Sequence, residues 1–124
     1  MYKITSDDEK KLAKLSIYQQ SILRILAEVP KGKVTTYGDL AKELARRDPK
    51  WSPKASRAVG TTMKNNPCGP WIPCHRVIKS DGSVGNFRGG AEGAVDEKIG
   101  MLQDEGVSVV NGRIDMEKFR HIFK

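Results

Sequence analysis

The side chains best suited to covalent chemistry stand together in the segment Cys74-His75-Arg76. A free thiol has a pKa of about 8.5 and is only a few per cent thiolate at neutral pH, so a nucleophilic cysteine needs a base or a cation nearby. His75 could serve as that base through a bridging water, with a carboxylate orienting its imidazole. The residue types alone leave a second interpretation open, in which Cys74 is a small buried hydrophobe and His75 a hydrogen-bonded core histidine.

The segment that leads to this cluster, residues 67–73, contains three prolines and a glycine. These residues exclude a regular helix, and we expect a shaped, extended loop. Adjacent side chains of extended backbone point to opposite sides, so direct contact between Cys74 and His75 is not expected unless the loop bends. Glu105, at the predicted end of a later helix, is the candidate that would orient the imidazole.

Composition limits the classes of protein to consider. The 124 residues, 38% of them hydrophobic, predict a single domain with a modest core. The net charge of +7 favours a polyanionic partner such as nucleic acid, although a lysine-rich surface would give the same charge. No apolar run is long enough to span a membrane, and the polar N-terminus is not a signal peptide. Two cysteines at this spacing form neither a disulfide framework nor a zinc pattern, so we expect no metal, no cofactor and a reducing location, cytoplasmic or, in a eukaryote, nuclear.

Four helices are predicted in the first half of the chain. Capping boxes at residues 6–9 and 16–19 precede the first two, and the second of these helices has the clearer apolar face. Thr36 is the predicted N-cap of the third helix, and Ser52-Pro53 predicts the start of the fourth. The third and fourth helices are typical of a helix-turn-helix. The small residues of the fourth could approach a nucleic-acid groove closely, or they could pack tightly against another helix.

The second half of the chain combines short extended segments with turns. Asp81-Gly82 and Asn111-Gly112 are hairpin signals, a helix is predicted over residues 91–104, and Asp115 is the predicted N-cap of a last short helix. The expected strands are residues 77–79, 83–84, 107–110 and 113–114. The pattern predicts an α+β fold, mainly α: a winged-helix-like domain with a helix-turn-helix and short β-hairpins.

Asn66-Pro67 and the later run Ile72-Pro73-Cys74-His75-Arg76-Val77 resemble the active-site signature of the O6-alkylguanine-DNA alkyltransferases, or methylated-DNA–protein-cysteine methyltransferases. Further motifs flank this signature in the family's order: Tyr18-Gln19-Gln20, residues 29–34, Thr36-Tyr37-Gly38, residues 57–60, Ser80-Asp81-Gly82, residues 85–90 and Glu105-Gly106. The resemblance covers residues 16–124, as an alkyltransferase catalytic and DNA-binding domain. It leaves residues 1–15 as a short N-terminal extension.

The resemblance implies DNA repair by direct reversal. Cys74 would attack the O6-alkyl carbon of guanine in DNA and keep the alkyl group as a thioether, so each molecule would act once. His75 would act through water as the base, and Glu105 would orient it. Asn66 would support the turn that presents the cysteine, and the Tyr37 hydroxyl would donate to the leaving guanine.

The resemblance also implies a mode of DNA binding. The second helix of the helix-turn-helix would enter the minor groove of double-stranded DNA that contains O6-alkylguanine, and Arg57 would fill the stack behind the flipped nucleotide. The other residues of this helix expected at the DNA are Ser56, Ala58, Gly60 and Thr61. The expected walls of the base pocket are Met63, Pro70, Trp71, Val84, Phe87 and Arg88, of which Met63 and Trp71 could equally be core residues. The protein would act as a monomer, without a membrane partner.

This sequence departs from the family pattern in two ways. About fifteen residues precede the match, where the family often has a further domain that holds a metal, so we expect a stand-alone catalytic domain without metal. Phe87 stands where tyrosine is common, which removes a hydroxyl contact, and Arg88 at the pocket rim could narrow the pocket for bulky adducts.

Three other functions remain open. Alkyltransferase-like proteins share the fold, lack the reactive cysteine, and bind the lesion to recruit other repair factors; Cys74 argues against this function. A helix-turn-helix regulator with a redox-sensitive Cys74 would bind undamaged DNA. A cysteine hydrolase with multiple turnovers is the least supported, because no separate triad or oxyanion motif is evident.

Overall fold

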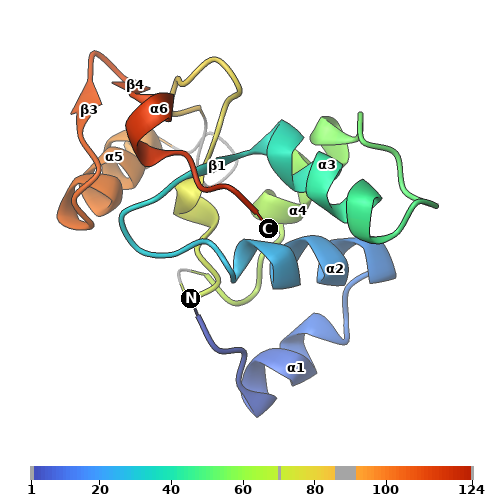
Figure 1. The fold of residues 1–124 in the computed structure, drawn as a ribbon. Coiled ribbons are helices and arrows are strands. Elements are labelled where there is room, and N and C mark those ends of the chain that lie inside the picture. Colours follow the sequence, from blue (N-terminus) through green and yellow to red (C-terminus); the bar gives the residue numbers. More distant parts are fainter. Residues whose placement is uncertain (1, 70, 86–91, 124) are drawn as a thin grey trace.

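The computed structural model describes residues 2–69, 71–85 and 92–123, and helices dominate it (Figure 1). The helices are α1 (Ser6–Leu12), α2 (Ile17–Leu26), α3 (Tyr37–Arg47), α4 (Ser56–Lys64), α5 (Ala94–Asp104) and α6 (Met116–Phe119), with one 3₁₀ turn, η1 (Cys74–Arg76). The strands are β1 (Thr35–Thr36), β2 (Val77–Ile78), β3 (Val109–Val110) and β4 (Arg113–Ile114). The predicted fold class, α+β and mainly α, is confirmed.

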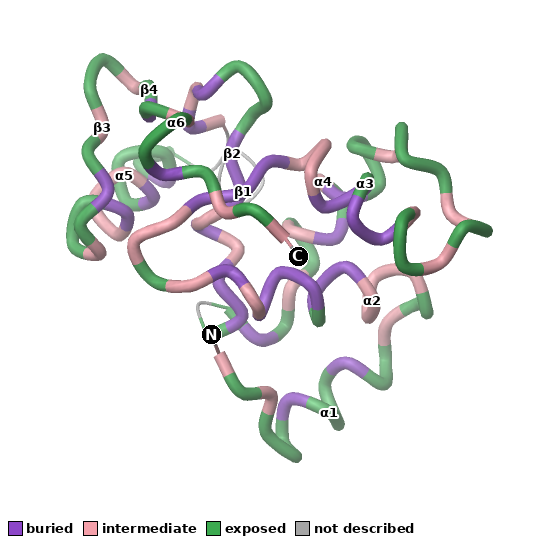
Figure 2. Tube along the Cα trace, viewed as in Figure 1, coloured by how far each residue is buried: buried purple, intermediate pink, exposed green. Residues whose placement is uncertain are grey.

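Helix α2 lies in the middle of the larger hydrophobic core, between α1 and the pair formed by α3 and α4 (Figures 1 and 2). It begins at the predicted capping box, in which the Ser16 side chain accepts a hydrogen bond from the Gln19 backbone N–H. Its buried residues are Ile22, Leu23, Ile25 and Leu26. Helix α3 also begins as predicted, because the Thr36 side chain accepts a hydrogen bond from the Asp39 backbone N–H.

Two predicted helix starts are wrong. The Ser52 hydroxyl does accept a hydrogen bond from the Lys54 N–H, but Ala55 leaves the helical region (φ −88°, ψ 37°), so α4 begins only at Ser56. The helix-turn-helix therefore has a longer connection than expected, over residues 48–55. Near the N-terminus, the N-cap of α1 is Thr5 and not Ser6, because the side chain that completes the capping box is Asp8 and not Glu9.

A short parallel pairing joins the two halves of the chain. Strand β2 pairs with β1, with Thr35 opposite Val77 and Thr36 opposite Ile78, so the predicted hairpin of residues 77–79 with residues 83–84 is not the main pairing. The turn itself exists, since the Lys79 N–H donates to the Ser83 carbonyl. Because the two strands are parallel and α3 follows β1 directly, this pairing places Tyr37, the first residue of α3, beside Lys79, which follows β2.

The predicted final hairpin is confirmed. Strands β3 and β4 are antiparallel, and Asn111 (φ 53°) and Gly112 (φ 71°) take the left-handed conformations that a tight hairpin turn requires. A smaller hydrophobic core lies beneath this hairpin and α5. Its buried residues are Val34, Ile78, Val84, Leu102, Val107, Ile114 and Phe119.

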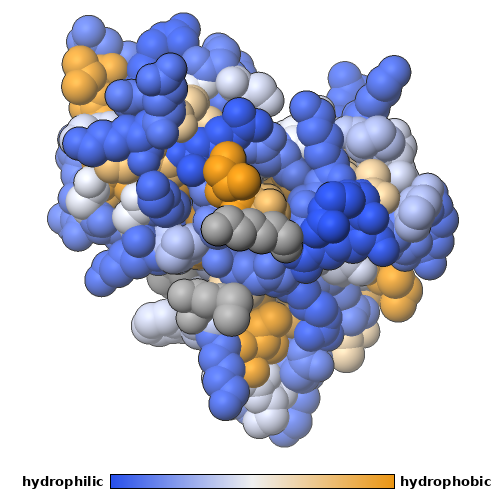
Figure 3. Space-filling model, in the orientation of Figure 1, coloured by the Kyte–Doolittle hydropathy of each residue, from blue (hydrophilic) through white to orange (hydrophobic). Residues whose placement is uncertain are grey.

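The face drawn in Figure 3 is mostly hydrophilic, with small, separate apolar patches. Within the described ranges, no helix is long and apolar enough to cross a lipid bilayer.

Candidate functional site

Cys74 stands at the start of η1, at the end of a turn that Asn66 closes. The Asn66 amide donates to the Ile72 carbonyl (2.9 Å), and its oxygen accepts from the Cys68 N–H (2.9 Å). The Cys74 backbone N–H donates in turn to the Ile72 carbonyl, and Cys74 is half-buried. The expected extended backbone is therefore wrong at this point, because the chain bends into a 3₁₀ turn over Cys74–Arg76.

His75 and Glu105, thirty residues apart in sequence, meet as predicted. His75 Nε2 lies 3.0 Å from Glu105 Oε2, and both side chains are largely buried. Arg76 completes the cluster, because its Nε and Nη2 donate to the two carboxylate oxygens of Glu105 at 2.8 and 2.7 Å. Its remaining nitrogen, Nη1, donates to the Val29 carbonyl (2.8 Å). The carboxylate is thus held in one orientation by Arg76 while it accepts from the imidazole.

The contact with Glu105 sets the tautomer of His75. An ionised carboxylate only accepts hydrogen bonds, so Nε2 carries the proton and Nδ1 carries a lone pair. Nδ1 is buried and has no hydrogen-bond partner among the described residues. Burial lowers the pKa of His75, and the Glu105 carboxylate opposes this only in part. At neutral pH the imidazole is therefore neutral, with a buried lone pair able to accept a proton.

Glu105 remains ionised at neutral pH. Burial raises its pKa, but the hydrogen bonds from Arg76 and His75 outweigh burial and hold the pKa of Glu105 below its ordinary value. The residue sits at the C-cap of α5, so its position depends on where that helix ends. A one-residue shift of the helix end would move the carboxylate away from both partners.

Tyr37 and Lys98 approach Cys74 from two other elements. Tyr37 is the first residue of α3; burial, and to a lesser degree the charge of Cys74, raises the pKa of its phenol, which therefore stays protonated and able to donate. Lys98, on α5, is fully buried, and its Nζ donates to the carbonyls of Val77 (2.6 Å) and Val84 (2.7 Å). Burial lowers the pKa of Lys98 to about 8, although proximity to Cys74 favours the ammonium.

Neither Lys98 nor Arg76 has a role in the site expected from the sequence. Lys98 lies on the buried stripe of α5, between Ala94 and Leu102, whereas the apolar Val95 is 37% exposed. The spacing of Ala94 and Leu102, four residues on either side of Lys98, was a readable sign that this lysine points inward. No comparable signal identifies the partner of Arg76.

The outer face of α4 points to solvent. Ser56, Arg57, Ala58 and Thr61 are exposed, whereas Val59 and Thr62 face the core. Among the described residues, a Cβ on Gly60 would meet nothing within 4 Å. The small residues Ser56, Ala58 and Thr61 therefore do not serve helix–helix packing, which was the alternative interpretation of this helix, whereas Thr62 does face the core.

The expected pocket residues are placed only in part. Trp71 is 66% exposed and so is not a core residue, while Met63 packs partly buried against the larger core. Val84 is 2% exposed within the smaller core, which leaves little of its side chain to face a ligand. Pro70, Phe87 and Arg88 lie outside the described residues. Their part in a base pocket stays a prediction.

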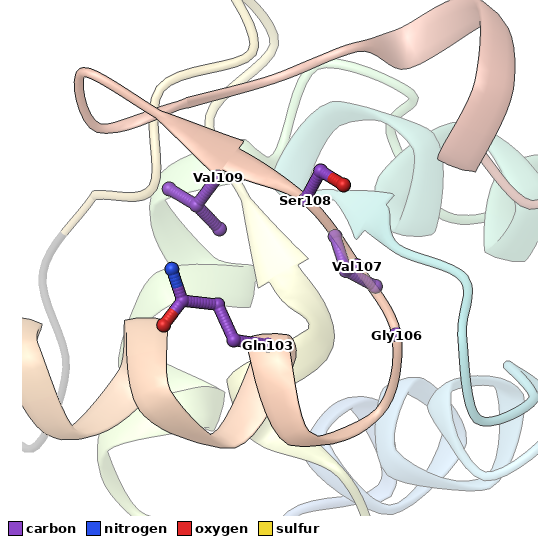
Figure 4. A pocket seen from close by; sticks show the side chains of 5 residues that line it. All are labelled: Gln103, Gly106, Val107, Ser108 and Val109. Carbon is purple, nitrogen blue, oxygen red and sulfur yellow. The ribbon is translucent and has the colours of Figure 1, made fainter.

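A shallow pocket lies elsewhere, between the end of α5 and β3 (Figure 4). Its lining residues are Gln103, Gly106, Val107, Ser108 and Val109. These residues include no cysteine, histidine or charged side chain, and none of them was predicted as a site residue. The chemistry of the molecule therefore centres on the Cys74 segment.

A family model described as the DNA-binding domain of 6-O-methylguanine DNA methyltransferase matches residues 17–107. The chain belongs to this family. A bifunctional methyltransferase/endonuclease of Picrophilus torridus is 43% identical to it over 96 residues, which are 77% of this chain and 29% of that protein. A DNA base-flipping protein of Escherichia coli K12 is 35% identical over 113 residues, 90% of this chain and 80% of that protein. The structure of Mycobacterium tuberculosis OGT in complex with DNA is similar with a TM-score of 0.65 at 29% identity, over 75% of this chain and 51% of that one.

The alkyltransferase family predicted from the sequence motifs is thus confirmed. This chain spans well under half of the Picrophilus protein, and the activity of a whole relative does not transfer to it directly. In this alkyltransferase-family chain, the Cys74 segment and the end of α5 bring together Cys74, His75, Arg76 and Glu105. Arg57 lies apart from them, on the exposed face of α4.

Proposed function

We propose that this protein removes an alkyl group from O6-alkylguanine in double-stranded DNA and transfers it irreversibly to Cys74. The observation that carries the proposal is the buried network behind Cys74, in which Arg76 fixes Glu105 and Glu105 fixes the tautomer of His75. A cysteine that served only packing would have no need of an oriented, neutral imidazole with a free lone pair beside it.

The proposed reaction is a single displacement. The Cys74 thiol passes its proton through a water to Nδ1 of His75, the sulfur forms a bond to the alkyl carbon, and the bond from that carbon to O6 breaks. The electron pair of the broken bond stays with the guanine, which takes up a proton. The net result is that the proton of the thiol is replaced by the alkyl group and ends on the guanine. Tyr37, a protonated phenol beside Cys74, is suited to donate to the guanine as this negative charge develops.

The substrate base must leave the duplex, because a stacked base cannot reach a half-buried sulfur. We propose that α4 enters the minor groove and that Arg57 takes the place of the extruded nucleotide. Its guanidinium is exposed and makes no ion pair with any residue of the described ranges, and the neighbouring small residues leave room for the sugars. The net charge of +7 supports phosphate contacts that offset part of the cost of extrusion.

Residues 16–124 would form the catalytic and DNA-binding unit, acting as a monomer. Two named similarities support a DNA partner: the M. tuberculosis protein was solved in complex with DNA, and the E. coli relative is a DNA base-flipping protein. Neither similarity decides between transfer and binding alone, so the test must observe the alkyl group itself.

The test is intact-protein and peptide mass spectrometry after incubation with an O6-methylguanine duplex. The expected result is one added methyl per protein, on the peptide that contains Cys74, with none on Cys68. The Cys74→Ala variant should bind the same duplex and gain no mass. Methyl on Cys68, or product in excess of one equivalent per protein, contradicts the proposal.

A second function is favoured by one observation, the 35% identity to the E. coli base-flipping protein over 90% of this chain. In this alternative the protein binds the lesion and recruits other repair factors without removing the alkyl group. Tight and lesion-dependent binding by a protein that stays unmodified after a long incubation would establish it.

A further inference from the structure

The N-terminal segment, residues 2–12, lies outside the part of the chain that the family model matches, yet it packs directly under the Cys74 loop. Leu12 is fully buried in the same core cluster as Cys68 and Ile72, and Tyr2 packs against that cluster. The Tyr2 backbone N–H donates to the Ala27 carbonyl (2.9 Å), which ties the start of the segment to the end of α2. In Figure 1 the segment lies on the side of α2 away from α3.

A buried carboxylate organises this contact. Asp8 is only 4% exposed, and it accepts hydrogen bonds from the Tyr2 hydroxyl and from the Thr5 N–H (3.0 Å). These bonds lower the pKa of Asp8, the Tyr2 bond most, so the buried group is ionised at neutral pH. Cys68 is buried in the same core cluster as Leu12, which lies one helical turn after Asp8 on α1. Burial first, and then the charge of Asp8, raises the pKa of the Cys68 thiol, which therefore remains protonated.

Cys68 is in turn part of the turn that presents Cys74. Its N–H is held by the Asn66 side chain, and its carbonyl accepts from the Ile72 N–H (2.9 Å). Gly69, the next residue, lies against the reactive sulfur: a Cβ there would stand 3.5 Å from Cys74 Sγ. Any movement of Cys68 would therefore be transmitted to the sulfur through a single neighbouring residue.

We propose that Asp8, held by Tyr2 and Thr5, is a positioning residue for alkyl transfer: it anchors Cys68 and thereby fixes the turn that presents Cys74. This inference rests on the proposed function and gives a role to two features that the sequence motifs leave without one, the N-terminal extension and the second cysteine. Asp8 does not touch the reacting atoms, and its burial keeps it from DNA.

The experiment measures single-turnover methyl transfer at saturating O6-methylguanine duplex, well below the unfolding temperature of each variant. Asp8→Asn keeps the shape of the side chain and removes its charge; we expect the rate constant to fall about fivefold, the factor that one net hydrogen bond represents, with unchanged DNA affinity. Cys68→Ala should give a similar loss and Cys68→Ser, which retains a donor, should restore the rate. The matched control is Glu9→Gln. Glu9 lies on the same helix as Asp8, and its substitution breaks only an exposed ion pair with Arg24 of α2, so the rate should be unchanged.

A double-mutant cycle then tests the connection. If Asp8 acts through Cys68, the double variant Asp8→Asn/Cys68→Ala should be no slower than the slower single variant. Full additivity, equal losses for Cys68→Ala and Cys68→Ser, or a wild-type rate in Asp8→Asn would each overturn the proposal.

Hydrogen exchange separates this proposal from the proposed function. The Cys68 and Ile72 amides are both hydrogen-bonded within the turn and should exchange faster in Asp8→Asn, but not in Glu9→Gln, in the absence of DNA. If the wild-type protein takes up no methyl group, the proposed function fails, and faster exchange still supports the anchor. Unchanged exchange in Asp8→Asn overturns the anchor whether or not transfer occurs.

Discussion

Glu105→Gln is the substitution that most directly tests the buried network. The Glu105 carboxylate accepts three hydrogen bonds, one from His75 and two from Arg76, and its side chain is 11% exposed. Removing one partner of a buried ion pair typically costs 3–5 kcal/mol, because the other charge remains buried and unpaired. The substituted amide would keep one acceptor oxygen and Arg76 would keep the Val29 carbonyl, so we take the low end, about 3 kcal/mol.

The expected cost translates into a thermal shift. The entropy of unfolding is about 2.1 cal/mol/K per residue, or about 0.26 kcal/mol/K for 124 residues, so the melting temperature should fall by about 12 °C. Transfer should fall further than stability predicts, because an amide that donates toward Nε2 favours the tautomer with the proton on Nδ1. Differential scanning fluorimetry measures the first effect, and single-turnover transfer at low temperature measures the second.

Glu9→Gln serves again as the matched control, because it removes the same carboxylate from an exposed pair whose side chains are 42% and 51% exposed. Such a pair contributes about 1 kcal/mol or less, so the shift should be no more than about 4 °C. If Glu105→Gln shifts the melting temperature no more than Glu9→Gln does, the network is not a buried ion pair in solution. Transfer at the wild-type rate in Glu105→Gln would refute the role assigned to the tautomer.

Three further predictions concern the imidazole and helix α4. Burial lowers the pKa of His75 below its unfolded value of about 6.5, so the unfolded chain binds more protons than the folded protein below that pH. The free energy of unfolding should therefore fall as the pH decreases through about 6.5, and urea titrations should show a smaller fall in His75→Gln. Gly60→Ala should stabilise the protein by up to about 1 kcal/mol, because no described residue lies within 4 Å of the added Cβ, while weakening DNA binding in a fluorescence titration. Arg57→Ala should reduce extrusion of a fluorescent base analogue more than it reduces binding to undamaged DNA; equal losses, as expected for the exposed Lys64→Ala control, would make Arg57 an ordinary phosphate contact.

The elements of the fold that depend on local chemistry were readable from the sequence. Ser16 and Thr36 cap helices where they were expected to, and the Asn111-Gly112 turn forms the expected hairpin. These features are set by hydrogen bonds within a few residues and by the φ values that glycine and asparagine tolerate. The expected hydrogen bond from the Lys54 N–H to the Ser52 hydroxyl does form, so the local signal was correctly read. The predicted start of α4 is nevertheless wrong, because Ala55 leaves the helical conformation and the helix begins only at Ser56.

The non-local features could not be read in the same way. No local pattern pairs β2 with β1, since the competing hairpin partner of β2 was much nearer in sequence. The meeting of His75 with Glu105 was predicted from the family motifs, whereas the two hydrogen bonds from Arg76 to the same carboxylate depend on how η1 packs against α5. Asp8 was assigned to a helix terminus alone, whereas the position of its helix against the cluster that contains Cys68 follows from the packing of α1 in the larger core.

Cationic side chains lie behind Cys74. Arg76 is paired with the ionised Glu105, and the buried Lys98 adds a positive charge close to the sulfur, in a region with little access to water. Burial already lowers the pKa of Lys98 to about 8, which shows that this positive charge is costly in the resting protein. Negative charge that develops on the Cys74 sulfur during attack would offset that cost, whereas a thioether would carry no charge. The same arrangement therefore favours attack by the developing thiolate and gives the uncharged thioether product no such stabilisation.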